Sequence, residues 1–141
     1  ILTRIKNPYE ILDQTTPRGK LVYKRADSFV KDYQRLWKLA TKDVTNEKLL
    51  VFTYHHSKYS FTKELANELL YKYPKKKLII AREKNGEMKC SLRSTDVKLP
   101  PLVAKALIGV EGYGGGHEHA CGACIKKEDF NRFVEQFKEQ L

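Results

Sequence analysis

GYGGGHEHACGACI, residues 112–125, is the stretch on which the interpretation of this sequence depends. Three consecutive glycines, Gly114, Gly115 and Gly116, remove side chains from a segment that we expect to be a loop, so that backbone N–H groups can approach a ligand closely. His117 follows them as a polar, titratable side chain. The combination indicates a cradle for an anion, although glycines also serve plain tight turns.

A second informative segment lies upstream, at the end of a predicted strand. Asn85-Gly86 favours a type I′ turn because both residues tolerate positive φ, so it predicts an antiparallel hairpin whose second strand covers residues 87–92. This hairpin delivers Arg93, followed by Ser94, to the strand end. Arginine offers a planar fork of donors that suits a phosphate or a base edge. Taken alone, an exposed arginine at a strand end would be the simpler interpretation.

The segment Cys90-Ser91-Leu92-Arg93-Ser94, followed by residues 114–122, resembles the DHH-associated (DHHA) domain of the DHH phosphoesterase superfamily. That family's pattern is a strand ending in a Ser-x-Arg-Ser-like segment, then a helix, then G-G-G-H-x-x-A-x-G. Both halves occur here in the same order, and the combined motif is specific where either half alone is not. The resemblance covers roughly residues 49–141. It implies a linker or tail of a missing catalytic domain at 1–26, a connecting helix at 27–46 and a DHHA substrate-binding domain at 47–141.

The resemblance also implies a function, since the superfamily includes RecJ-like single-strand exonucleases, nanoRNases and cyclic dinucleotide phosphodiesterases. In such enzymes the DHHA domain positions single-stranded DNA or RNA, or a short oligonucleotide or dinucleotide. A preceding DHH catalytic domain carries manganese or magnesium and activates the water. The resemblance therefore implies no catalytic residue, metal or cofactor in this chain, which we expect to bind substrate without hydrolysing it.

The implied substrate-binding residues each have an expected role. The backbone N–H groups of Gly114, Gly115 and Gly116 approach a phosphate or sugar, and His117 donates to a non-bridging phosphate oxygen. Arg93 and Ser94 hold the terminal nucleotide. Two alternatives remain: a tRNA-binding module like that of alanyl-tRNA synthetases, and an interaction module that has lost its ligand site.

Composition limits the class of protein. With 141 residues, of which 41% are hydrophobic, the chain can bury one core of useful size. A net charge of +10 favours polyanionic partners, against the plainer alternative of a lysine-rich solvated surface. Apolar runs stay well below the roughly 20 residues of a membrane span, and three cysteines without an export signal favour reduced thiols. We expect a soluble, cytoplasmic protein with no membrane partner.

Hydrophobic patterning predicts an α/β fold: a mixed sheet of about four or five strands with flanking helices, containing the antiparallel hairpin. Asp27 or Ser28 is a candidate N-cap for the first long helix, and Ser60 for the next. The predicted strands cover residues 49–54, 78–81, 87–92 and 122–125, and the predicted helices that follow the first strand cover about 60–71, 100–108 and 128–140.

Two groups of residues raise the question of a metal. His117, His119, Cys121 and Cys124 form H-x-H-x-C-x-x-C, in which all four side chains are competent zinc ligands. If residues 121–125 are extended, however, cysteines three apart point to opposite faces. The pair His55-His56 follows a tyrosine rather than an aspartate, and neighbouring side chains on an extended segment diverge. We therefore predict no metal site.

Overall fold

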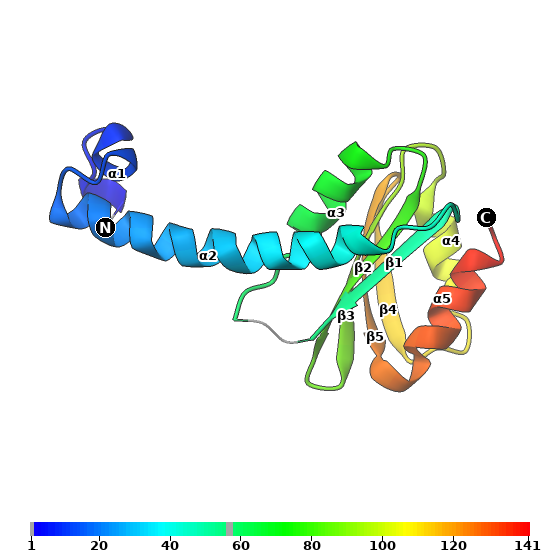
Figure 1. The fold of residues 1–141 in the computed structure, drawn as a ribbon. Helices are drawn as coiled ribbons and strands as arrows, with labels where there is room; N and C mark the ends of the chain where they lie inside the picture. Colours follow the sequence, from blue (N-terminus) through cyan, green and yellow to red (C-terminus); the bar gives the residue numbers. More distant parts are fainter. Residues whose placement is uncertain (1, 56–57) are drawn as a thin grey trace. The chain divides into compact units, whose positions relative to one another are not determined.

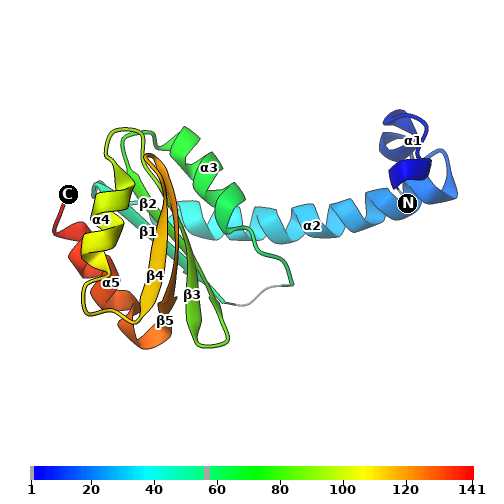
Figure 2. The same ribbon diagram turned by 180° about the vertical axis from the view of Figure 1, so that it is seen from behind.

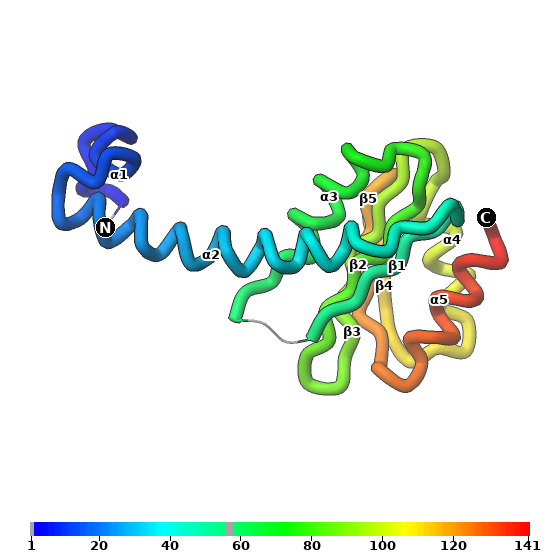
Figure 3. Tube along the Cα trace, in the orientation of Figure 1, coloured from blue at the N-terminus to red at the C-terminus, as the bar shows by residue number. Residues whose placement is uncertain are grey.

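The computed structural model describes residues 2–55 and 58–141, and the chain divides into two compact units, 1–42 and 43–141. The Cα trace in Figure 3 follows both units in sequence order. Each unit is described by itself. No helix in the described part of the chain is long and apolar enough to cross a membrane.

The first unit is a small helical arrangement dominated by one long helix. A 3₁₀ turn, Leu2–Arg4, and a short helix α1, Tyr9–Leu12, precede α2, Pro17–Lys42. Thr16 precedes α2, and its hydroxyl accepts the Gly19 amide at 3.1 Å and donates to a Glu10 carboxylate oxygen at 2.6 Å. Gly19 is buried against Glu10, where a Cβ atom would lie 1.9 Å from the Glu10 carbonyl oxygen.

The predicted start of the long helix is wrong. Asp27 and Ser28 lie in the middle of α2, which begins ten residues earlier at Pro17 and ends at Lys42, so the expected bounds of 27–46 do not hold. Thr16 acts as the N-cap and Pro17 occupies the first helical position, where its missing N–H costs nothing. Asp27 instead pairs with Lys31 one turn later, at 2.6 Å.

The second unit is a five-stranded mixed sheet with three helices (Figure 1). The strand order is β1-β2-β3-β5-β4, in which β1 and β2 are parallel and every other neighbouring pair is antiparallel. The predicted fold class is confirmed. The elements are β1 Leu49–Tyr54, α3 Thr62–Lys72, β2 Lys77–Lys84, β3 Glu87–Arg93, α4 Leu99–Ala106, β4 Gly112–His117, β5 Ala120–Lys126, a 3₁₀ turn Lys127–Asp129 and α5 Phe130–Lys138.

The helices lie on both faces of the sheet, as the view from behind shows (Figure 2). α4 and α5 cover one face, where Val103, Phe133 and Phe137 are fully buried against alternate residues of the strands. α3 packs on the other face over β2 and β3. Because side chains alternate along a strand, each strand supplies one set of residues to each layer.

Local turn chemistry explains how the hairpin forms. Asn85 and Gly86 have φ values of 55° and 74°, so the predicted positive-φ turn between β2 and β3 is confirmed. The predicted N-cap of α3 is wrong: the helix starts at Thr62, after Phe61, and has no side-chain cap. Instead, the Tyr54 hydroxyl accepts the Phe61 amide at 2.9 Å, which fixes the loop end to β1.

The glycine-rich segment is not the loop that we expected. Residues Gly112–His117 form the edge strand β4, whose pairing with β5 continues without a break as far as His117 and Ala120. Glycines are weak strand formers in isolation. Here the partner strand and the close fit of α4 against β4 stabilise the extended conformation.

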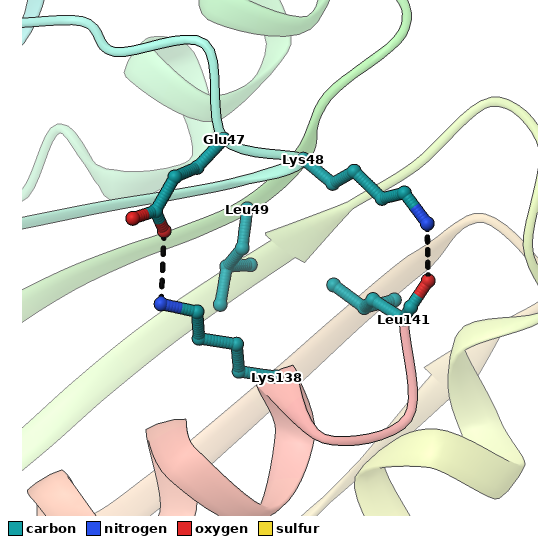
Figure 4. A pocket seen from close by; sticks show the side chains of 5 residues that line it. All are labelled: Glu47, Lys48, Leu49, Lys138 and Leu141. Carbon is teal, nitrogen blue, oxygen red and sulfur yellow. Dashed lines mark hydrogen bonds and ion pairs between the residues drawn. The ribbon is translucent and has the colours of Figure 1, made fainter.

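The last helix is held to the first strand on the α5 side of the sheet. Lys138 pairs with Glu47 at 2.9 Å, and Lys48 donates to the carbonyl oxygen of Leu141 at 2.7 Å (Figure 4). With Leu49 these residues line a shallow hollow of about 250 Å³. The ion pair of Lys138 and the hydrogen bond of Lys48 border its opening and hold α5 against β1, so we attribute the hollow to the packing of the fold.

Candidate functional site

An open patch of sheet lies over β5 and β4, on the face that α3 covers farther along at β2 and β3. Antiparallel register aligns Arg93 with Ala120, and Ala120 with His117, in one row across β3, β5 and β4. Residues directly opposite each other in antiparallel strands share a face. The arginine and the histidine that the sequence singled out therefore stand on the same face, separated by one strand, at roughly 10 Å between their backbones.

Two further rows follow along the same face. The second row is Ser91, Gly122 and Gly115, and the third is Lys89, Cys124 and Tyr113. Gly115 and Gly122 are exposed, so the centre of the patch is bare backbone. Rows two residues apart are separated by about 7 Å. The patch is thus long enough for one or two nucleotide-sized groups, and we call these nine positions the glycine face.

Arg93 is held in place by hydrogen bonds that leave part of its donor fork free. Its Nε donates to Asn67 Oδ1 of α3 at 2.9 Å, and one terminal nitrogen donates to the carbonyl of Leu92 at 2.8 Å and more weakly to that of Cys121 at 3.4 Å. Partial burial lowers the pKa of Arg93, although a guanidinium remains charged at neutral pH. A half-desolvated, oriented cation interacts more strongly with an anion than a fully hydrated one does.

The tip of the β4–β5 hairpin is fastened to the segment that follows Arg93. The Ser94 amide donates to the His119 carbonyl at 3.3 Å, and the Leu99 amide donates to the Glu118 carbonyl at 2.7 Å. His119 Nδ1 lies 3.2 Å from the Val97 carbonyl oxygen. These contacts fix His117, one residue before the tip, relative to Arg93.

Ser94 is placed differently from the other predicted site residues. Its side chain is 1% exposed, and its hydroxyl donates to Asp96 Oδ1 at 3.0 Å. The Ser94 Oγ also accepts the backbone amides of Asp96 and Val97, at 3.3 and 3.1 Å. Asp96 in turn accepts from Lys77 Nζ at 2.7 Å. Ser94 therefore shapes the turn that carries Arg93 and does not present its hydroxyl to the glycine face.

The three consecutive glycines serve three different purposes. Gly114 faces α4, where a Cβ atom would lie 2.9 Å from Ala123 Cβ and 3.0 Å from Val103 Cγ1. Gly116 has φ of 149°, and a Cβ atom there would lie 2.5 Å from the Ala120 carbonyl oxygen. Gly115 is different, because a Cβ atom there meets nothing within 4 Å. Packing and backbone geometry explain two of the glycines and leave Gly115 unexplained by the fold.

Tyr113 and Lys89 are site residues that the sequence analysis missed. The Tyr113 side chain is 73% exposed at one end of the glycine face, and Lys89 is exposed one strand beyond Cys124. An exposed aromatic ring beside a bare backbone floor is suited to stacking on a base. The signal was present: in an extended segment Tyr113, Gly115 and His117 recur at the two-residue period of one face. This period was not recognised because we expected the segment to be a loop.

The residues present do not fit a resident metal ion. Cys121 faces the core with α4 and α5, and its thiol lies 3.5 Å from the His117 carbonyl, whereas Cys124 faces the opposite side. Within residues 2–55 and 58–141, no group of three or more His, Cys, Asp or Glu side chains could hold a metal ion. His55 pairs with Glu83 at 3.1 Å, and His56 lies outside the described residues.

Burial makes the cysteines poor nucleophiles. It raises the pKa of Cys90 to about 12, and it also raises the pKa of Cys121 and of Cys124. Since the thiolate is the reactive form, a raised pKa together with burial lowers the reactivity of these thiols. Cysteine chemistry at the glycine face is therefore not supported.

A mixed α/β sheet with an exposed, glycine-rich edge strand defines the class of domain. Residues 46–141 match the DHHA1 domain family, and the chain belongs to that family. The resemblance found in the sequence is thereby confirmed. No curated protein matches the sequence.

Solved structures share this fold at low sequence identity. RecJ of Thermus thermophilus in complex with Mg²⁺ gives a TM-score of 0.68 at 18% identity, over 86% of this chain and 19% of that one. The C-Ala domain of Aquifex aeolicus alanyl-tRNA synthetase gives 0.57 at 19% identity, over 69% and 93%. The pGpG-specific phosphodiesterase of Vibrio cholerae gives 0.57 at 16%, over 84% and 42%. This chain thus spans less than half of the RecJ and phosphodiesterase chains.

Neighbouring glycines should respond in opposite ways to the same change. Gly114→Ala pushes a methyl group into Ala123 and Val103, so we expect it to lower the free energy of unfolding by about 1 to 3 kcal/mol. Gly115→Ala enters open space and should change it by less than about 0.5 kcal/mol. Urea denaturation of both variants measures the difference. Equal destabilisation would contradict the assignment of separate purposes.

The turn below Arg93 should be sensitive to pH through Asp96. The hydrogen bond from Lys77 lowers the pKa of this carboxyl, with a smaller effect from the Ser94 hydroxyl. A lowered pKa in the folded state contributes stability above the ordinary pKa of the carboxyl, and that stability is lost as the pH falls through the folded value.

We therefore expect Asp96→Asn to be less stable than the parent by roughly 1 kcal/mol at pH 7, with the difference shrinking below about pH 4. Urea denaturation of Asp96→Asn and of the parent, at pH 7 and at a pH below about 4, measures this difference in the free energy of unfolding. Glu68→Gln, on the exposed side of α3, is the control and should show little difference at either pH. A deficit in Asp96→Asn that is the same at both pH values would show that the carboxylate charge is not responsible.

Proposed function

We propose that the DHHA1 domain of this chain binds the terminal nucleotide of a single-stranded nucleic acid, or a short oligonucleotide or dinucleotide, on the glycine face. The observation that carries the proposal is the alignment of Arg93 and His117 in one row beside Gly115. A phosphate over this row meets a positioned guanidinium, an imidazole and exposed backbone. These are the groups that anion recognition by proteins uses repeatedly.

Each residue has a distinct role in the proposed complex. The free donors of Arg93 bind a phosphate oxygen, and His117 donates to a non-bridging oxygen of the same or the adjacent phosphate. Gly115 and Gly122 allow the sugar-phosphate backbone to lie against the sheet. Tyr113 stacks on the base, about 14 Å from the arginine row. Ser94 acts indirectly, by fixing the turn that orients Arg93.

The chemistry that this face supports is positioning. Holding a scissile bond in one orientation can contribute several kcal/mol to a reaction whose attacking water is activated elsewhere. We propose that a DHH catalytic domain with manganese or magnesium precedes this domain in the whole protein, making it an exonuclease or oligonucleotide phosphodiesterase. RecJ structures bound to Mg²⁺ and to Mn²⁺ support this arrangement by likeness of fold.

A tRNA-binding module is the second candidate. The observation that favours it is the likeness of fold to the C-Ala domain of alanyl-tRNA synthetase, which has a TM-score of 0.57 over 69% of this chain, compared with 0.68 over 86% for RecJ. The positive charge of the chain suits either ligand. The row of Arg93 and His117 favours a single phosphate group near a strand end over a broad duplex surface.

Loss of the arginine row should weaken binding without unfolding the domain. For Arg93→Ala and for His117→Ala we expect the affinity for a short single-stranded oligonucleotide to fall by about 1 to 3 kcal/mol, or roughly 5- to 150-fold, because each removes a charge-assisted contact. Fluorescence anisotropy measures this loss. Arg132→Ala is the matched control, since Arg132 is an exposed arginine on α5 over the opposite face. Unchanged affinity in folded Arg93→Ala would refute the assigned role.

The two candidate functions predict different ligand preferences. A terminal-nucleotide site should bind a dinucleotide with 5′-phosphate and a short single strand with similar affinity, because both fill the same row. A tRNA-binding module should prefer folded tRNA and lose affinity when the tRNA is replaced by single-stranded fragments of it. A competition experiment, in which each of the three ligands displaces the same labelled oligonucleotide from the protein, decides between the two functions. The same experiment with Gly115→Ala shows whether the ligands compete at the glycine face.

A further inference from the structure

The long helix α2 carries a row of cations along one side. Eight of its residues are lysine or arginine and two are aspartate. Six of the cations recur at intervals of three, four or seven residues, which are the intervals of a single helix face. We call this row the basic stripe. It consists of Lys20, Lys24, Lys31, Arg35, Lys38 and Lys42.

The basic stripe is narrow, long and exposed. At about 100° per residue, its six positions fall within roughly 60° of arc around the helix. From Lys20 to Lys42 it extends over about 33 Å, at 1.5 Å per residue. All six side chains are exposed. A straight track of regularly spaced charge matches the form of a polynucleotide backbone, whose phosphates are also regularly spaced along a line.

Most charges of the basic stripe have no ion-pair partner within the described part of the chain. Among residues 2–55 and 58–141, only Lys31 of the six has an ion-pair partner, Asp27, at 2.6 Å. Three pairs within the stripe stand four residues apart with like charge, which destabilises a helix. Asp27 is the one acidic residue of α2 on this side, so the side keeps a large excess of positive charge, whereas a solvated helix face normally mixes both signs more evenly. An external polyanion would offset this repulsion.

The opposite side of α2 argues against a membrane surface as the partner. Apolar residues gather there, and Leu36 and Ala40 are only 5% and 6% exposed. A helix that lies on a membrane inserts a continuous apolar face into the lipid and carries its Lys and Arg residues on the opposite, polar face. In α2 the exposed Arg18 and Arg25 interrupt the apolar side, and part of that side, at Leu36 and Ala40, is already buried, so α2 offers a membrane no continuous apolar face.

We propose that the basic stripe binds the phosphate backbone of a single-stranded nucleic acid, as a second surface distinct from the glycine face. Five of its six members are lysines, which bind phosphates as point charges. The stripe contains no aromatic side chain for base stacking and no bidentate array for base edges. Binding there is therefore independent of sequence, dependent on strand length and steeply dependent on salt. The inference does not rest on the proposed function of the glycine face.

Two double variants, each of which replaces two cationic residues by glutamine, test the basic stripe. Arg35→Gln/Lys38→Gln removes two charges from it, and Arg18→Gln/Arg25→Gln removes two exposed charges from another side of the same helix. Glutamine preserves helix propensity, which circular dichroism verifies. Both variants of the 141-residue chain are titrated by fluorescence anisotropy with a single-stranded oligonucleotide of about 20 nucleotides, between roughly 0.05 and 0.3 M salt.

The expected result is a difference in salt slope. Each phosphate contact to a single strand contributes about 0.7 to the slope of log K against log salt, so the stripe variant should lose about 1.4. Its affinity at about 0.1 M salt should fall on the order of tenfold, and the control variant should retain the parental slope. Equal loss in both variants would show diffuse electrostatic attraction and overturn the proposal. An unchanged salt slope in the stripe variant would also overturn the proposal. The same holds if the stripe variant loses binding to anionic lipid vesicles but keeps its binding to the oligonucleotide.

Binding of a dinucleotide distinguishes a failure of the basic stripe from a failure of the glycine face. It is too short to follow the stripe, so Arg35→Gln/Lys38→Gln should bind it like the parent. If the glycine face fails as a binding site and the stripe holds, the dinucleotide does not bind while the longer strand still loses slope in the stripe variant. If the stripe fails and the glycine face holds, dinucleotide binding still depends on Arg93 while both helix variants keep the parental slope.

Discussion

The register of three antiparallel strands is the constraint on which the candidate site depends. Arg93, Ala120 and His117 come from three strands, and only the pairing of β3 with β5 and of β5 with β4 places them in one row. A slip of one residue would turn each side chain to the opposite face. Two features prevent a slip of β4: the close fit of Gly114 under α4, and the hydrogen bonds that tie the hairpin tip to the segment after Arg93.

The layers of the domain explain why the glycine face stays open. α4 and α5 bury one side of the sheet over β2, β3 and β5, whereas α3 covers only β2 and β3 on the other side. Larger apolar side chains on this side of β4 and β5 would need a second helix to bury them. The small residues found there need none, so their backbone stays accessible. Two glycines of β4 thus divide these tasks: Gly114 allows tight packing on one side of the strand, and Gly115 allows direct access on the other. A site of this kind needs no deep pocket, because the sheet itself is the binding surface.

Local chemistry in the sequence predicted the fold well where one signal dominated. Asn85-Gly86 specified its turn, and the apolar runs specified the buried strands. Prediction failed where two signals competed. Asp27 and Ser28 have the chemistry of an N-cap but lie inside a helix that starts at Pro17, and the glycines of β4 resembled a loop because strand formation there depends on partners distant in sequence. The roles of Gly114 and Ser94 were beyond reach for the same reason, since they depend on what Val103 and Asp96 bring near them.

The buried thiols have a consequence for how the domain responds to oxidants. Cys90, Cys121 and Cys124 are all nearly inaccessible, and their protonated forms are favoured by burial. A protonated, shielded sulfur is slow to react with peroxide or with disulfides. Oxidants should therefore modify these three thiols more slowly than they modify exposed, ionised cysteines.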